Sequence, residues 1–98
     1  MQDVITAAPA SVIEPAHPLP FVHRDGATTS FWAPDRTGEY EVQCARGRAY
    51  ADALLAHMRE TRNPTLYGAV MRGITSEGVY GGVEIGFCNR IGIELIGL

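Results

Sequence analysis

Few residues of this chain have types and spacing that could do chemistry, and a cysteine–histidine pair is the first of them. Cys44 and His57 would form a nucleophile and its base if their side chains met. Both fall in one predicted helix, where a rise of about 1.5 Å per residue separates them by roughly 20 Å. Cys44 also lies on the apolar stripe of that helix, which favours a buried, unreactive thiol. The sequence therefore predicts no catalytic residues, and we do not expect an enzyme.

Metal and cofactor sites are not expected either, because the ligand types lack the required spacing. The candidate ligands include no C-x-x-C pair, and prolines separate the first two histidines; they are His17, His23, His57, Cys44 and Cys88. The glycine cluster at 78–86 matches neither G-x-G-x-x-G after a strand nor a G-K-[ST] phosphate loop. Glu84 and Glu94 could approach each other only across a hairpin, on its exposed face, which is a poor place for acid–base catalysis.

All basic side chains of the chain are arginines, and four of them could contact nucleic acid. Arg46, Arg48, Arg59 and Arg62 all fall in the first predicted helix, where they could bind phosphates. The net charge of −3 does not favour a polyanionic partner. A following helix of glycine and isoleucine is also unsuited to reading bases in a major groove. Because the four arginines could still bind phosphates, a small DNA-binding regulator is the alternative function, and the two other observations make it the less favoured one.

Two helices must position these side chains. The first is predicted over about 39–62, where apolar residues recur at intervals of three and four. Its first turn is acidic and its last turn carries arginines, as the helix dipole favours. Asn63-Pro64 ends this helix and starts a second one over 64–76, because the residue before proline avoids the α region. Gly78 then suits the C-terminal cap of the second helix.

Residues 21–32 have the pattern of a short β-hairpin. Aromatic and β-branched residues lie on both sides of Asp25-Gly26, which is a strong signal for a type I′ turn. A lone hairpin is only marginally stable in water, so this one must pack on the rest of the chain. Phe31 and Trp32 are the expected anchors.

The N-terminal residues 1–19 are rich in alanine and proline and are expected to form an extended arm. One interpretation is a disordered terminus. The other is a tail that docks on a neighbouring surface through Val12, Ile13 and Leu19. In both cases, residues 20–98 are predicted to form a single small globular domain.

The glycine-rich end of the chain, residues 78–98, fits two structures. As a helix over about 80–97 it carries an apolar ridge and a stripe of glycines four residues apart. As a hairpin at 82–96 it alternates apolar residues with glutamates and glycines. The helix is favoured because only in a helix does the glycine spacing let another backbone come close. The predicted fold class is mainly α, a small three-helix domain with a short N-terminal hairpin and an extended arm; the alternative is an α+β fold with the second hairpin.

The function that these patterns favour is a protein–protein interaction or regulatory module that self-associates as a homodimer or binds another protein. A chain this short buries a modest core, and oligomerisation is a common remedy. The predicted interface consists of Gly78, Gly82, Gly86, Phe87 and Ile93. The sequence has no apolar run of membrane-spanning length and no basic signal-peptide start, so a reducing cytoplasm is expected. The arginine, alanine and glycine bias suggests a bacterial gene.

Overall fold

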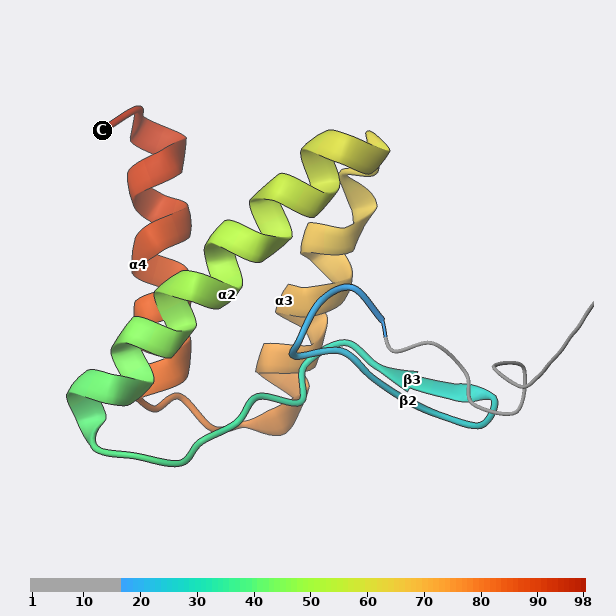
Figure 1. Cartoon of the computed structure of the whole chain (residues 1–98), viewed down its shortest axis with the longest axis horizontal. Helices are drawn as coiled ribbons and strands as arrows, with labels where there is room; N and C mark the ends of the chain where they lie inside the picture. Colours follow the sequence, from blue (N-terminus) through green and yellow to red (C-terminus); the bar gives the residue numbers. More distant parts are fainter. Residues whose placement is uncertain (1–16) are drawn as a thin grey trace, which may run out of the picture.

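The computed structural model describes residues 17–98, and the fold is mainly helical (Figure 1). Its elements in chain order are β2 (His23–Asp25), β3 (Thr28–Ser30), α2 (Tyr40–Thr61), α3 (Thr65–Glu77) and α4 (Gly82–Ile96). The predicted fold class, with helices over about 39–62, 64–76 and 80–97 after a short hairpin, is confirmed. The alternative with a second hairpin at 82–96 is wrong, because that stretch forms α4. Residues 1–16 of the predicted arm lie outside the described residues.

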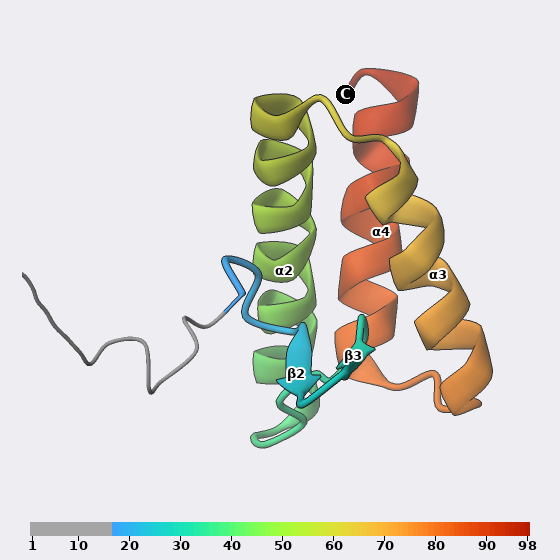
Figure 2. The ribbon, with the colours of Figure 1, turned by 90° about the vertical axis from the view of Figure 1, so that its right-hand side faces the viewer.

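The helices α2 and α4 run in the same direction and α3 runs in the opposite one (Figure 2). Although α3 follows α2 directly in sequence, α2 packs mainly on α4. These two helices lie closest near their N-terminal halves and diverge toward their C-terminal ends (Figure 1). The chain between the hairpin and α2 passes beneath them, so residues far apart in sequence meet at that end of the molecule.

The helix α4 forms despite its glycines because both of its ends are capped. At the start, the Glu84 carboxylate accepts a hydrogen bond from the Gly81 backbone N–H at 2.9 Å, and its negative charge also suits the helix dipole. At the end, Gly97 adopts the left-handed conformation with φ 78°, and its N–H donates to the Glu94 carbonyl at 3.2 Å. Gly78, at the C-terminal cap of α3, also adopts the left-handed conformation with φ 75°, as the sequence indicates.

The hairpin turns one residue later than expected. Its register pairs Asp25 with Thr28, so the two turn residues are Gly26 and Ala27 rather than Asp25 and Gly26. Gly26 has φ 62°, whereas the only non-glycine residue with positive φ in the described chain is Arg62. A positive φ at the first centre alone is the pattern of a type II′ turn, which requires glycine there. The hairpin prediction is confirmed, and the type I′ assignment is wrong.

The core is an aromatic cluster that joins the hairpin segment to the helices. The indole of Trp32 lies 5.0 Å from the ring of Phe87 and 5.3 Å from the ring of Phe21, measured between ring centroids. Tyr50 of α2 completes the cluster, 5.0 Å from Phe21. Leu19, at the end of the predicted arm, is also buried in this core. The expectation that Trp32 anchors the hairpin segment is thus confirmed.

Candidate functional site

The glycines of the C-terminal stretch make a close contact between α4 and α2 of the same chain. A Cβ atom placed on Gly86 would lie 2.0 Å from the carbonyl oxygen of Cys44. On the facing helix, a Cβ on Gly47 would lie 2.0 Å from the carbonyl oxygen of Val83. Both distances are far inside van der Waals contact, so each helix needs glycine at the point where it meets the other. The close approach that the glycine spacing predicts therefore occurs within one chain.

Because of this contact, some residues of the predicted interface are buried within the chain and others are exposed. Gly82, Gly86 and Phe87 are buried within the chain, so in this fold they do not face a second copy. Gly78 is exposed at the end of α3, and Ile93 is an exposed apolar residue on α4. Of the five, Ile93 is the one that presents an apolar side chain to solvent.

A buried carboxylate holds the hairpin segment to α4. The side chain of Glu84 is fully buried, and its Oε2 accepts a hydrogen bond from the Trp32 indole N–H at 2.8 Å. Its Oε1 accepts from Arg36 Nη1 at 2.9 Å, and Arg36 Nη2 lies 2.7 Å from Oε2, which makes a two-pronged ion pair. With the Gly81 N–H as a further donor, the carboxylate is surrounded by donors from three residues, two of them in the loop before α2 and one just before α4. We call these four residues the Glu84 node.

Opposing effects act on the pKa of Glu84. Burial raises it, but hydrogen bonds from Arg36, Trp32 and the Gly81 backbone together hold it below the ordinary value. The hydrogen bond between Arg36 and Glu84 also raises the pKa of Arg36. Glu84 is therefore ionised at neutral pH, and the node is a structural ion pair rather than a proton donor. The sequence did not predict this node, although it carries two signals of it: a glutamate three residues after a cap glycine, and a core tryptophan that needs a hydrogen-bond acceptor.

Where α2 and α4 diverge, apolar side chains are exposed. Leu95, Ile96 and Leu98 are 77%, 72% and 87% exposed, and Ile93 lies on the same helix. Beside them is a shallow hollow of about 560 Å³, which lies between the end of α2 and the start of α3 and is lined by Leu55, Met58, Arg59, Arg62, Pro64 and Tyr67. An ion pair between Arg59 and Glu94 connects the two sides. We call the hollow and the four exposed residues at the C-terminal end of the chain, Ile93, Leu95, Ile96 and Leu98, the apolar end.

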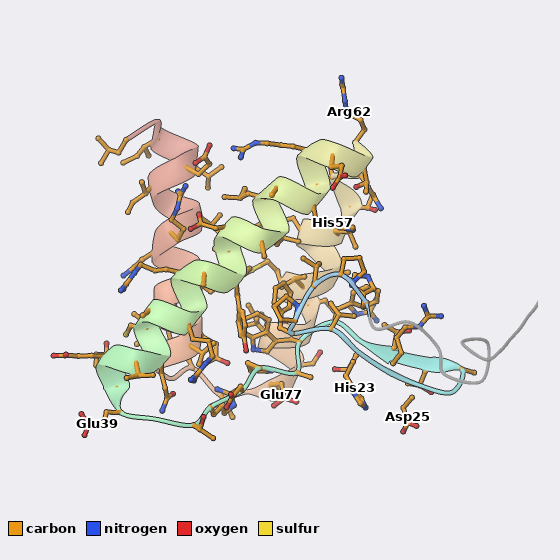
Figure 3. The ribbon with its side chains drawn as sticks, in the orientation of Figure 1. His23, Asp25, Glu39, His57, Arg62 and Glu77 are labelled. Carbon is orange, nitrogen blue, oxygen red and sulfur yellow. The ribbon has the colours of Figure 1, made fainter. Side chains whose placement is uncertain are left out.

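The four arginines of the nucleic-acid alternative differ in how far they are engaged within the chain. Arg46 donates hydrogen bonds to the carbonyl oxygens of Asp35 and Thr37, so it secures the loop before α2. Arg59 is paired with Glu94. Arg48 and Arg62 are exposed, and Arg62 points away from the helices at the end of α2 (Figure 3). Two of the four side chains therefore already have intramolecular partners.

A second hollow, of about 450 Å³, lies between the hairpin and α3. We call it the β3–α3 cleft; it is lined by Thr29, Ser30, Phe31, Trp32, Ala69, Arg72, Gly73, Ser76 and Glu77. At its base the backbone of α3 comes close to Trp32, because a Cβ on Gly73 would lie 2.8 Å from the Cβ of Trp32. Its volume falls in the range of ligand-binding clefts. No pattern in the sequence pointed to it.

The two cysteines are free and half-buried, on α2 and α4. A hydrogen bond with the Cys44 thiol raises the pKa of Tyr40, and one with Cys88 raises the pKa of Tyr80. Each thiol thus has a phenol as its neighbour, and neither has a histidine base among its hydrogen-bond partners in residues 17–98. The expectation that Cys44 and His57 do not meet is in keeping with this placement.

Two histidines meet in a contact that the sequence did not indicate. The rings of His17 and His57 lie 5.8 Å apart, edge to face, and His17 Nδ1 accepts a hydrogen bond from the Leu19 N–H. Burial lowers the pKa of His17, and the nearby positive charges of His57 and Arg24 lower it further. Across residues 17–98, no three histidine, cysteine or acidic side chains gather in a group that could hold a metal ion.

Comparison with known proteins identifies no relative of this chain. No family model, curated protein or solved structure matches the chain. In the part of the chain that the structure describes, no helix is both long and apolar enough to cross a lipid bilayer. The surfaces that could carry a function are the apolar end, the arginines and the β3–α3 cleft.

Proposed function

We propose that this protein is a small interaction module that self-associates through its apolar end, in the reducing cytoplasm of a bacterial cell. The observation that carries the proposal is the exposure of Leu95, Ile96 and Leu98 on one helix end. A soluble monomer scatters single apolar residues over its surface, whereas a concentrated apolar patch is typical of an interaction site. The free thiols of Cys44 and Cys88 fit a reducing compartment.

The shape of the apolar end supports a second copy as the partner. It combines a protruding apolar helix end on α4 with an open hollow between α2 and α3. In a twofold dimer, the same surface of both copies meets, so the helix end of each copy enters the hollow of the other. The hollow is apolar at Leu55 and Met58 and has Arg59 and Arg62 among its lining residues, which resembles the apolar centre and polar rim of protein interfaces.

Analytical ultracentrifugation between about 1 and 100 µM, the range where weak dimers dissociate, tests this proposal. We expect the mass of the wild-type protein to rise toward that of a dimer. Replacing Leu95 and Ile96 by glutamate introduces two charges into the apolar surface, so the double variant should remain a monomer. Asn89→Glu adds a charge to an exposed position of the same helix and should leave the association unchanged. A wild-type protein that is monomeric throughout the range would contradict the proposal.

Binding to DNA is the alternative proposal, through phosphate contacts of the arginines of α2. The engagement of Arg46 and Arg59 within the chain reduces the charge that this surface offers. We expect no mobility shift with a random DNA duplex at low salt. A shift that disappears above about 200 mM salt and weakens in the Arg48→Gln and Arg62→Gln variants would instead support the alternative.

A further inference from the structure

The outer edge of β3 presents main-chain groups that the hairpin does not use. In a hairpin with a two-residue turn, the residues that flank the turn form a hydrogen-bonded pair, and the next pair along does not. Here Asp25 pairs with Thr28 and Arg24 with Thr29. The backbone N–H and C=O of Thr28 therefore point toward β2, while those of Thr29 point away from it. In residues 17–98 the sheet contains β2 and β3 alone, so no third strand pairs with Thr29.

This free edge faces the β3–α3 cleft. In Figure 2, β3 lies between β2 and α3, and Thr29, Ser30 and Phe31 line the same hollow as the residues of α3. Ala69, Gly73 and Ser76 are the small residues of the facing helix, so the side chains that oppose the edge are short. The cleft therefore has unpaired main-chain groups on one wall and room beside them, as strand addition requires.

One side chain of the cleft, Arg72, favours an acidic residue in the partner. Arg72 lines the cleft, and within residues 17–98 its guanidinium forms neither an ion pair nor a hydrogen bond. Glu77 also lines the cleft, so the lining carries one positive and one negative side chain, and the preference for an acidic residue is local to Arg72. An incoming carboxylate would find a planar donor in Arg72 that can bind both of its oxygens.

We infer that the β3–α3 cleft binds an extended peptide segment of another protein, which adds to the hairpin as a third strand and places an acidic side chain against Arg72. The main chain of Thr29 supplies the hydrogen bonds that any extended peptide can make. Arg72 and the half-buried ring of Phe31 supply the preference for an acidic residue beside an apolar one. This surface is separate from the apolar end, so peptide binding and self-association can each fail without the other.

A phage-displayed library of random heptapeptides, selected on the full chain, supplies the probe. We expect the selected peptides to combine β-branched or aromatic residues with aspartate or glutamate. One of them, synthesised and titrated into isotope-labelled protein, should shift the amide resonance of Thr29 and slow its hydrogen exchange. A selection that yields no peptide, or a peptide that leaves the Thr29 amide unaffected, would overturn the inference.

Two pairs of variants separate strand addition from other contacts. Thr29→Pro removes an N–H that points away from β2, so the hairpin keeps its own hydrogen bonds, and an edge strand tolerates proline at such a position. Binding of the peptide should fall at least tenfold in this variant. Thr29→Val keeps the N–H and should bind as the wild type does. Arg72→Gln should weaken the same peptide about tenfold through loss of a charge-assisted hydrogen bond. Arg48→Gln, at an exposed arginine of α2, is its control. Unchanged affinity in both Thr29→Pro and Arg72→Gln would refute the inference even if a peptide binds.

Discussion

Gly86→Ala is expected to destabilise the fold by about 3 kcal/mol or more. The added methyl would overlap the Cys44 carbonyl oxygen at 2.0 Å, and its nearest neighbours are all backbone atoms of α2. Because backbone cannot rotate aside as a side chain can, the two helices must separate. That movement would also open the core beside Phe87, which α4 contributes from the next position. A domain of this size has a total stability of only about 5–15 kcal/mol, so the loss is a large fraction of it.

Urea denaturation followed by far-UV circular dichroism measures this effect, and Gly92→Ala is its matched control. Gly92 lies on the same helix, and a Cβ atom there would meet nothing within 4 Å. Alanine is about 1 kcal/mol more favourable than glycine inside a helix, so Gly92→Ala should leave stability unchanged or raise it. Equal effects of the two substitutions would show that helix propensity, and not the approach of α2, governs the glycines of α4.

The second large effect is expected for Glu84→Gln, which should lower the free energy of unfolding by about 3 kcal/mol. The variant keeps the shape of the side chain and an oxygen for the Trp32 indole. It removes the negative charge that faces Arg36, and it places an amide N–H₂ group among donors. Breaking one half of a buried ion pair is strongly destabilising, because the other half is left without compensation. The measurement is the same urea titration at neutral pH.

Glu94→Gln is the control, because Glu94 also lies on α4 and pairs with arginines, but nearer the surface. Its partner Arg59 is 63% exposed, and exposed ion pairs contribute about 1 kcal/mol or less. We therefore expect Glu94→Gln to change stability far less than Glu84→Gln does. Similar losses in the two variants would mean that burial does not distinguish the Glu84 node from an ordinary surface ion pair.

The pH dependence of stability gives the Glu84 node an independent signature. Its folded-state pKa is held below the ordinary value, so the unfolded chain binds the proton more readily. The stabilisation by Glu84 is thus fully present above the unfolded pKa of about 4.3 and is lost as the pH falls through the folded value. In Glu84→Gln this part of the acid dependence should disappear.

The first two helices could be predicted from the sequence because apolar periodicity and a proline boundary are local signals. The stripe from Cys44 to Met58 and the Asn63-Pro64 boundary placed the first two helices within about two residues of their observed ends. The C-terminal stretch was ambiguous because its glycines weaken both a helix and a strand. Besides the caps at its two ends, the helix packs on α2 where Gly86 meets the backbone of Cys44, and no local pattern reveals a contact across that distance.

The candidate sites were harder to predict, for a related physical reason. Glycines four apart predict a close approach, but they do not say whether the other backbone belongs to the same chain. The Glu84 node joins residues 48 and 52 positions apart, so a glutamate that fits the solvent face of a strand is instead the buried acceptor of Trp32 and Arg36. The observed turn lies one residue later than predicted because a single glycine can occupy either centre of a two-residue turn, so local residue types alone do not fix the register.

The packing of α2 on α4 rather than on α3 also has a consequence for how fast the chain folds. The contact between Gly47 and the backbone at Val83 can form only after the intervening segment has been brought round, and that closure costs chain entropy before any contact rewards it. Helical proteins usually fold fast because neighbouring helices pair first. In this chain α2 and α3, the first helices in sequence, pack little on each other, so we expect the rate-limiting step to bring α4 back onto α2. We therefore expect folding to be slower than for an up-and-down bundle of the same length.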